Sequence, residues 1–327
     1  MGVTTDTDLE VAAARLAALL TGGATTLADP STSQLEFEPS IALRPLRRGP
    51  VPADVWAVDG GQAVVADARC LQLLVTRAAR VRFTDGRCDE DEGPLRAVLL
   101  GGEDERAAAV RALGVPGLRA DSSVDVNLLR DRWEWEAIER CVDEVEPGGL
   151  VLVDGDLQPD WRIPSRVLAA VLATAVERGV TLAGVTKHSS LSRGGAPLLG
   201  ALELEAELAF GPRSLWWAPV ARTRNDAGGV QVVAARLDGD ARFAFRIDLP
   251  SALDPELALG AVASVADDAA FPGYPYPLSV ADRLAACPRW LKADVRLRLD
   301  ELFDRAGVPE QVRERAFADR HDLMERA

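Results

Sequence analysis

Two kinds of hydrophobic pattern alternate along the chain, and together they predict a protein that mixes strands with helices. Short, continuous apolar runs at residues 55–58 and 150–153 are typical of strands that are buried on both faces. Apolar residues at helical spacing predict helices elsewhere. These cover residues 103–113, 130–145 and 163–178, and the chain from 277 to its C-terminus with a break at 307–309.

The N-terminal part carries a clear helix signal followed by a stretch with no periodicity. Thr7 and Glu10 form a capping box, apolar residues follow at helical spacing, and Gly22-Gly23 ends the run. Residues 25–52 contain several prolines, so we expect an extended connection there.

The remaining segments read as strands and turns. Strands are expected at 63–66, 71–83 and 180–185, with a turn at Asp85-Gly86, and alternating strands fill 215–248 with turns at 225–229 and 238–239. Strands interleaved with helices predict an α/β fold with one mixed β-sheet core flanked by helices, additional antiparallel strands and a helical C-terminus.

Composition and charge narrow the class of protein. Hydrophobic residues make up 48% of the 327 residues and charged residues 27%, which is a normal globular balance. No apolar run reaches the roughly 18 residues that span a bilayer, and the first ten residues are polar and acidic, unlike a secretory signal. Four isolated cysteines and two histidines argue against a structural zinc site and favour a reducing cytoplasm.

The net charge of -14 bears on any function that involves nucleic acid. A chain with this charge does not attract DNA through its overall field. A DNA-binding function therefore requires basic residues concentrated in one groove, or positive potential supplied by metal ions or a partner.

Two aspartates follow the two buried apolar runs in the same way. Asp59 and Asp154 each come after a valine and before a glycine, at the expected carboxyl end of a strand, where open α/β sheets bind ligands. If the two strands are neighbours, the carboxylates repel each other, and a divalent cation such as Mg²⁺ or Mn²⁺ relieves that repulsion. The alternative is that Asp-Gly marks an ordinary turn.

Two further acids are candidates of different strength. Glu134 lies on the apolar stripe of its predicted helix, at i-4 from Ile138, where a carboxylate needs a partner. Its position near the helix start allows a solvated acid instead. Asp282 borders an apolar face early in another helix, and without further context it reads as a solvated acid.

In their order along the chain, four segments resemble the NurA nucleases, and a strand followed by Lys187 resembles a fifth element of that family. The four are Trp56-Ala57-Val58-Asp59-Gly60-Gly61, residues 130–134, Leu150-Val151-Leu152-Val153-Asp154-Gly155-Asp156-Leu157, and Gly273-Tyr274-Pro275-Tyr276-Pro277-Leu278 with Ala281-Asp282. The resemblance spans most of the chain. It divides the chain into an N-terminal helix and connection (1–50), an RNase H-like nuclease domain (51–291) and a C-terminal helical extension (292–327).

The resemblance also implies an activity and partners. The implied activity is that of a 5′-to-3′ exonuclease and single-strand endonuclease that depends on Mn²⁺ or Mg²⁺, with two ions bound. The resemblance further implies that the chain forms a homodimer and acts in DNA end resection together with a HerA-type hexameric ATPase. By motif match, Asp59, Glu134, Asp154 and Asp282 are the expected metal ligands, and Tyr274 is a further active-site residue. Asp282 stands where well-known members carry histidine, and aspartate is a good ligand for a hard cation.

The segment after residue 185 supplies candidate substrate contacts. Lys187 and Arg193 flank a short polar loop and are expected to hold a substrate phosphate, although both also read as ordinary surface charges. His188 in the same loop reads as structural or solvent-facing. Trp216-Trp217 reads as core or dimer contact more readily than as a stacking platform.

Two other functions compete with the nuclease. Actin- and sugar-kinase-type enzymes share the RNase H-like core, and Asp59-Gly60-Gly61 resembles their first phosphate loop. They also need a second glycine-rich loop, of which residues 154–157 are a poor version, and no Walker A sequence is present. A degenerate nuclease that only scaffolds a translocase is expected to have lost its carboxylates, whereas all four positions here are acidic.

Overall fold

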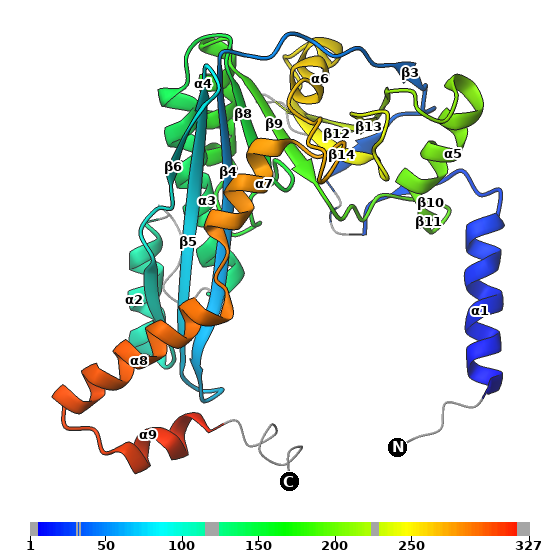
Figure 1. Cartoon of the computed structure of the whole chain (residues 1–327). Helices are drawn as coiled ribbons and strands as arrows, with labels where there is room; N and C mark the ends of the chain where they lie inside the picture. The colour runs from blue at the N-terminus through cyan, green and yellow to red at the C-terminus, as the bar shows by residue number, and fades with distance from the viewer. Residues whose placement is uncertain (1–5, 31, 33, 115–123, 224–228, 319–327) are drawn as a thin grey trace. The chain divides into compact units, whose positions relative to one another are not determined.

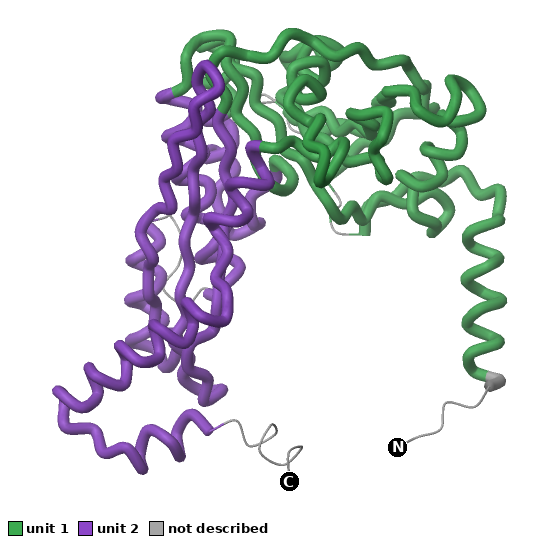
Figure 2. The backbone as a smooth tube through the Cα atoms, in the orientation of Figure 1, with its two compact units in different colours: residues 1–55, 145–157, 172–276 green, residues 56–144, 158–171, 277–327 purple. Residues whose placement is uncertain are grey.

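The computed structural model describes residues 6–30, 32, 34–114, 124–223 and 229–318 (Figure 1). Contacts within the chain divide it into two compact units, coloured separately in Figure 2. Unit 1 comprises residues 1–55, 145–157 and 172–276, and unit 2 comprises residues 56–144, 158–171 and 277–327. Each unit is built from segments that are far apart in the sequence.

The strands of the main sheet are hydrogen-bonded in the order β2-β12-β13-β14-β9-β8-β4-β5-β6, with β3 paired to β12 and β7 paired to β5. The parallel pairing of β8 (Leu150–Asp154) with β9 (Thr181–Thr186) joins an otherwise antiparallel run, β9-β14-β13-β12. Both pairing modes therefore occur, and the mixed α/β sheet predicted from the sequence is confirmed.

Unit 1 is built around an antiparallel sheet whose central strands are almost entirely buried. Its core strands are β12 (Trp216–Thr223), β13 (Val230–Arg236) and β14 (Phe245–Pro250). Shorter strands are β1 (Leu27–Ala28), β2 (Leu35–Phe37), β3 (Arg44–Pro45), β10 (Ser192–Arg193) and β11 (Ala196–Pro197). Its helices are α1 (Asp6–Thr21), α5 (Leu198–Phe210) and α6 (Pro255–Ala263).

Unit 2 centres on a long hairpin with helices packed against it. Its strands are β4 (Asp54–Asp67), whose first two residues are assigned to unit 1, β5 (Gln72–Thr84), β6 (Arg87–Asp91) and β7 (Arg96–Leu100). Its helices are α2 (Glu103–Leu113), α3 (Val126–Glu144), α7 (Tyr276–Ala285), α8 (Arg289–Arg305) and α9 (Glu310–Phe317). Helix α4 (Ser165–Glu177) belongs partly to each unit. Helix α3 packs on β5 and buries Glu134, as its position on the apolar stripe predicts.

One sequence expectation about the sheet is wrong. The prediction ended one strand at the carboxyl end of the run 55–58 and began another at 63–66, whereas β4 runs through all of these residues without a break. Asp59 therefore lies inside a strand rather than at its carboxyl end. The two glycines leave room for neighbouring atoms, because a Cβ at Gly60 would meet the Glu134 side chain and a Cβ at Gly61 would meet the Ala285 carbonyl oxygen.

Other expectations are confirmed with small shifts of the element ends. Asp85 and Gly86 have φ of 49° and 76° and form the predicted turn between β5 and β6. The side chain of Thr7 and residues 225–228 of the predicted turn lie outside the described residues. Strand β7 and helices α5 and α6 were not expected from the pattern. Helix α1 forms as predicted, but its Leu9, Leu16 and Leu20 are exposed.

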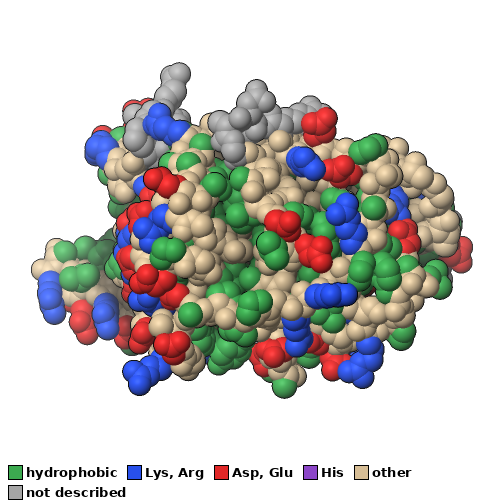
Figure 3. All heavy atoms as spheres, turned by 90° about the horizontal axis from the view of Figure 1, so that it is seen from above, with side chains coloured by type: hydrophobic (Ala, Val, Ile, Leu, Met, Phe, Trp, Pro, Cys, Tyr) green, Lys and Arg blue, Asp and Glu red, His purple; other side chains and the backbone are tan. Residues whose placement is uncertain are grey.

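In Figure 3, acidic and basic side chains are scattered over the visible face and intermingle among hydrophobic and other groups. Among the described helices, none is both long enough and apolar enough to cross a membrane.

Candidate metal centre

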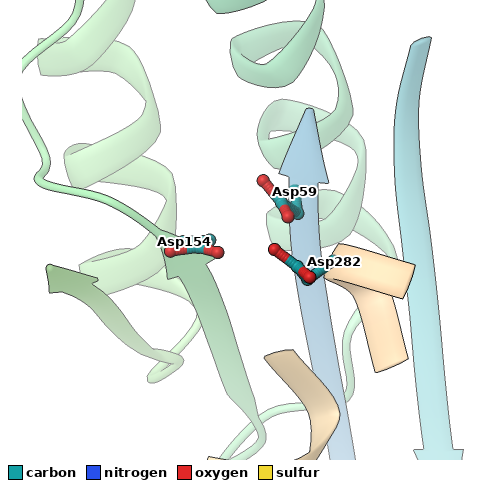
Figure 4. A group of neighbouring side chains, drawn as sticks. All are labelled: Asp59, Asp154 and Asp282. Carbon is teal, nitrogen blue, oxygen red and sulfur yellow. The ribbon is translucent and has the colours of Figure 1, made fainter. Parts of the chain in front are cut away.

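Three carboxylates that are far apart in the sequence lie together at the sheet. Asp59 on β4, Asp154 at the end of β8 and Asp282 on α7 each offer an oxygen within 4.8 Å of the others (Figure 4). Oxygens that bind one divalent ion at about 2.0–2.6 Å lie at most about 5 Å apart across it. The donor set and its spacing therefore fit a hard divalent cation, and β8 and β4 are neighbours as the sequence analysis required.

Asp59 is held in place by two glycines that let helices approach its strand. The Gly60 N–H donates to Asp59 Oδ1 at 2.7 Å. A Cβ atom on Gly60 would lie 2.5 Å from Glu134 Cδ, and a Cβ on Gly61 would lie 1.8 Å from the Ala285 carbonyl oxygen. At Gly61 the obstacle is backbone, so only glycine allows α7 to pack this closely on β4, whereas at Gly60 a Cβ would have to displace the Glu134 side chain.

Glu134 borders this region without joining the group of three. Its side chain is 8% exposed. Arg130 Nε lies 3.2 Å from Glu134 Oε2, one helical turn away, so the buried carboxylate has a cationic neighbour. That Glu134 binds metal stays a prediction from the sequence.

Asp154 is paired with a cation where β8 ends. Lys187 Nζ lies 2.6 Å from Asp154 Oδ2, just beyond the end of β9. The same Nζ lies 5.0 Å from the centroid of the Tyr274 ring, within reach of a cation–π interaction. Tyr274 is 3% exposed and packs against Phe245 and Phe271. Two residues predicted for the site, Lys187 and Tyr274, are thereby connected to Asp154.

The loop after Asp154 is anchored by a buried charge network that the sequence analysis did not identify. Arg246 on β14 is 1% exposed and binds Asp248 through Nε at 2.8 Å and through Nη2 at 3.0 Å. Its Nη1 lies 3.1 Å from Asp29 Oδ2, and its Nη2 lies 3.7 Å from Asp156 Oδ2. The Leu157 N–H donates to Asp248 Oδ2 at 3.2 Å.

This network also reaches the loop that carries Lys187, because the Ser190 hydroxyl donates to Asp29 Oδ1. Burial by itself lowers the pKa of Arg246, but the surrounding carboxylates of Asp248, Asp156 and Asp29 outweigh it and raise that pKa. The sequence carries one signal for this network. Arg246 and Asp248 are two residues apart on a strand and therefore share one face of β14.

Arg193, also predicted to bind substrate, has a different partner. It forms an ion pair with Glu205 on α5, so its charge is partly neutralised there. His188 is exposed. Trp216 and Trp217 are 1% and 2% exposed, which confirms that they are buried in the core.

One titrating acid lies on the helix that packs over Asp59. Burial raises the pKa of Asp131 on α3 to about 6, and the nearby Asp160 carboxylate adds to that shift. The Asp160 N–H donates to Asp131 Oδ2 at 2.7 Å and limits the shift.

The comparisons with known proteins identify the fold. No protein-family model matches the sequence, and no curated protein matches it either. The NurA nuclease from Sulfolobus solfataricus has a similar structure, with a TM-score of 0.54 and 11% identity, covering 93% of this chain and 96% of that one. The chain therefore has the RNase H-like fold that the sequence resemblance implied, in the form found in a NurA nuclease.

Two other solved structures are less similar. The catalytic domain of human Endonuclease V has a TM-score of 0.38 and 14% identity, covering 93% of this chain and 98% of that one. A second NurA structure has a TM-score of 0.41 and 8% identity, covering 73% of this chain and 86% of that one.

Proposed function

We propose that this chain is a metal-dependent deoxyribonuclease of the NurA type that hydrolyses phosphodiester bonds at the Asp59–Asp154–Asp282 centre. The observation that carries the proposal is the convergence of three carboxylates within 4.8 Å on a fold shared with a NurA nuclease. Carboxylate oxygens without histidine or cysteine are the ligand type that Mg²⁺ and Mn²⁺ prefer.

In this proposal the residues of the chain have the following roles. Asp59, Asp154 and Asp282 would hold the divalent ions, with Glu134 completing a second position from the buried side of β4. When bound, such ions activate water for attack on phosphorus and stabilise the leaving oxygen. Lys187, now paired with Asp154, carries an ammonium that can bind an oxygen of the scissile phosphate. The Tyr274 ring holds that ammonium near the centre.

The test of this proposal is cleavage of linear duplex and single-stranded DNA with Mn²⁺, with Mg²⁺ and with EDTA. Asp59→Asn and Asp154→Asn keep the side-chain shape but remove a charged ligand, so each is expected to lower cleavage at least about 100-fold, a typical cost of losing a catalytic electrostatic group. Asp143→Asn is the matched control, because Asp143 is an exposed acid on α3. Full activity in both site variants would reject the site.

The kinase-type alternative gains no support from the glycines of β4. Gly60 and Gly61 face the side chain of Glu134 and the carbonyl oxygen of Ala285, rather than an open loop that could cradle a phosphate. ATP hydrolysis by the isolated chain would favour that alternative. A scaffold without activity would instead bind DNA or a translocase with no cleavage under any metal.

The remaining proposals follow from the sequence resemblance. We infer a role in DNA end resection, with 5′-to-3′ polarity, as a homodimer working with a HerA-type hexameric ATPase in the cytoplasm. Light scattering of the purified chain tests the dimer, and co-purification with a co-expressed translocase of that type tests the partnership. If the chain is monomeric and does not co-purify with the translocase, these inferences are wrong, while the nuclease proposal is unaffected.

A further inference from the structure

A basic pocket lies within unit 2, at the end of the β4–β5 hairpin that is close to helices α8 and α9 (Figure 1). Its volume is about 490 Å³. Four cationic side chains line it, together with a single acid, Asp67. The cations are Arg69, Lys292, Arg296 and Arg315.

The cations come from three separate elements. Lys292 and Arg296 lie one turn apart on the same face of α8. Arg315 belongs to α9, and Arg69 lies in the turn after β4 with φ of 66°. The Arg296 guanidinium carbon lies 5.4 Å from the centroid of the Phe317 ring, which lines the same pocket.

Part of the positive charge in this pocket is not compensated by an acid. Among the described residues, Arg69, Lys292 and Arg315 form no ion pair, and all three side chains are exposed. Arg296 Nε is 3.7 Å from Asp300 Oδ2, a partly exposed i,i+4 pair of the weak kind. Asp67 accepts a hydrogen bond from the Arg69 N–H at 2.7 Å, and this bond, with one from Gln72, lowers the pKa of Asp67.

Several arginines elsewhere in unit 2 are matched with acids. Arg80 binds Asp91 and Glu144, and Arg96 binds Glu136. On a chain with a net charge of -14, four cations and one acid around a single pocket are a local excess of positive charge. Such a concentration is what an acidic protein needs to bind a polyanion.

We propose that this pocket binds backbone phosphates of the nucleic-acid strand that the carboxylate centre cleaves, an inference that rests on the proposed function. The cations are spread over three elements around about 490 Å³, which suits several consecutive phosphates better than one small anion. Along β4, Asp59 and Asp67 are eight residues apart, or roughly 26 Å at about 3.3 Å per residue. At about 3.4 Å per phosphate in a duplex strand, roughly eight nucleotides span that distance.

The experiment measures binding in EDTA, so that cleavage plays no part. A fluorescently labelled 30-nucleotide single strand is titrated with the full chain by fluorescence anisotropy at several salt concentrations. The test variant combines R69Q, K292Q, R296Q and R315Q. The control combines R87Q, R213Q, R222Q and R298Q, which removes the same charge from cationic side chains outside the pocket. Thermal unfolding monitored by circular dichroism checks that both variants fold.

The pocket variant is expected to bind at least about ten-fold more weakly than the control. Its salt dependence is expected to be shallower by about 0.7 in the slope of log K against log salt for each lost contact, hence by about 3 in total. Equal affinity and equal slope for the two variants would overturn the pocket proposal. That result would leave the nuclease proposal standing, because cleavage and its loss in Asp59→Asn are measured separately. Absence of metal-dependent cleavage by the unaltered chain would instead overturn the proposed function.

Discussion

The segments Val58-Asp59-Gly60 and Val153-Asp154-Gly155 have the same sequence but are held by different forces. Around Asp59 the backbone stays extended, and close packing of α3 and α7 against two glycines fixes the strand. Around Asp154 the strand ends, Gly155 has φ of 124° with open space around its Cα, and a buried charge network anchors the loop that follows. One carboxylate therefore depends on steric fit and the other on electrostatic matching.

The largest expected effect comes from removing the centre of the charge network. Arg246→Met leaves the Asp29 and Asp248 carboxylates, both fully buried, without their guanidinium. Breaking a buried ion pair in this way costs about 3–5 kcal/mol in the free energy of unfolding. Urea denaturation measures it, and Arg222→Met, which removes an exposed partner of Glu38, is the control. A loss under about 1 kcal/mol would show that the network does not anchor the Asp154 loop.

The steric side of the comparison is tested by alanine at the glycines. Gly61→Ala puts a Cβ atom 1.8 Å from the Ala285 carbonyl oxygen, so α7 must move away from β4. We expect a loss of about 3 kcal/mol, at the upper end for overpacking. Gly155→Ala meets no atom within 4 Å and bears only the strain of its positive φ, about 1–2 kcal/mol. If urea denaturation shows the same loss of unfolding free energy for both variants, close packing at Gly61 and backbone strain at Gly155 contribute equally to stability.

The difference between the two aspartates marks the limit of sequence reasoning. The apolar runs locate β4 and β8, and the glycine after each aspartate indicates a special backbone requirement at both places. No local signal distinguishes a glycine that turns from a glycine that receives a helix, because the atoms that press on Gly61 belong to Ala285. Asp282 shows the same limit, since its own helix indicates only a solvated acid and its place in the motif order that resembles NurA was the one signal that linked it to Asp59.

The helix that packs over Gly60 also makes stability depend on pH. Because the pKa of Asp131 is raised from 3.8 to about 6 in the folded chain, the folded state favours the protonated acid. Stability from this group is therefore present below about pH 4, is lost as pH rises towards 6, and stays lost above that. Asp131→Asn removes this penalty and still accepts the Asp160 N–H.

The expected gain for Asp131→Asn at pH 8 is at most about 3 kcal/mol, at about 1.4 kcal/mol per pKa unit. Denaturation of both chains at pH 4 and pH 8 measures it, and the two should have similar stability at the lower pH. Asp143→Asn, an exposed acid on the same helix, is expected to show no such pH dependence. A constant difference across this range would assign the effect to packing rather than to ionisation.

The smallest expected effect separates two roles for the cation at Asp154. In the absence of metal, the Lys187 ammonium lies 2.6 Å from the Asp154 carboxylate and competes with any ion for it. The pair is partly exposed, so its loss is expected to shift binding by about 0.5–1 kcal/mol, a two- to five-fold change. Lys187→Met should therefore bind Mn²⁺ two- to five-fold more tightly by isothermal titration calorimetry.

The DNA cleavage activity of Lys187→Met should fall, because the proposed phosphate contact is gone. Arg222→Met should change neither, and weaker Mn²⁺ binding by Lys187→Met would show that the lysine organises the carboxylates instead of competing for them.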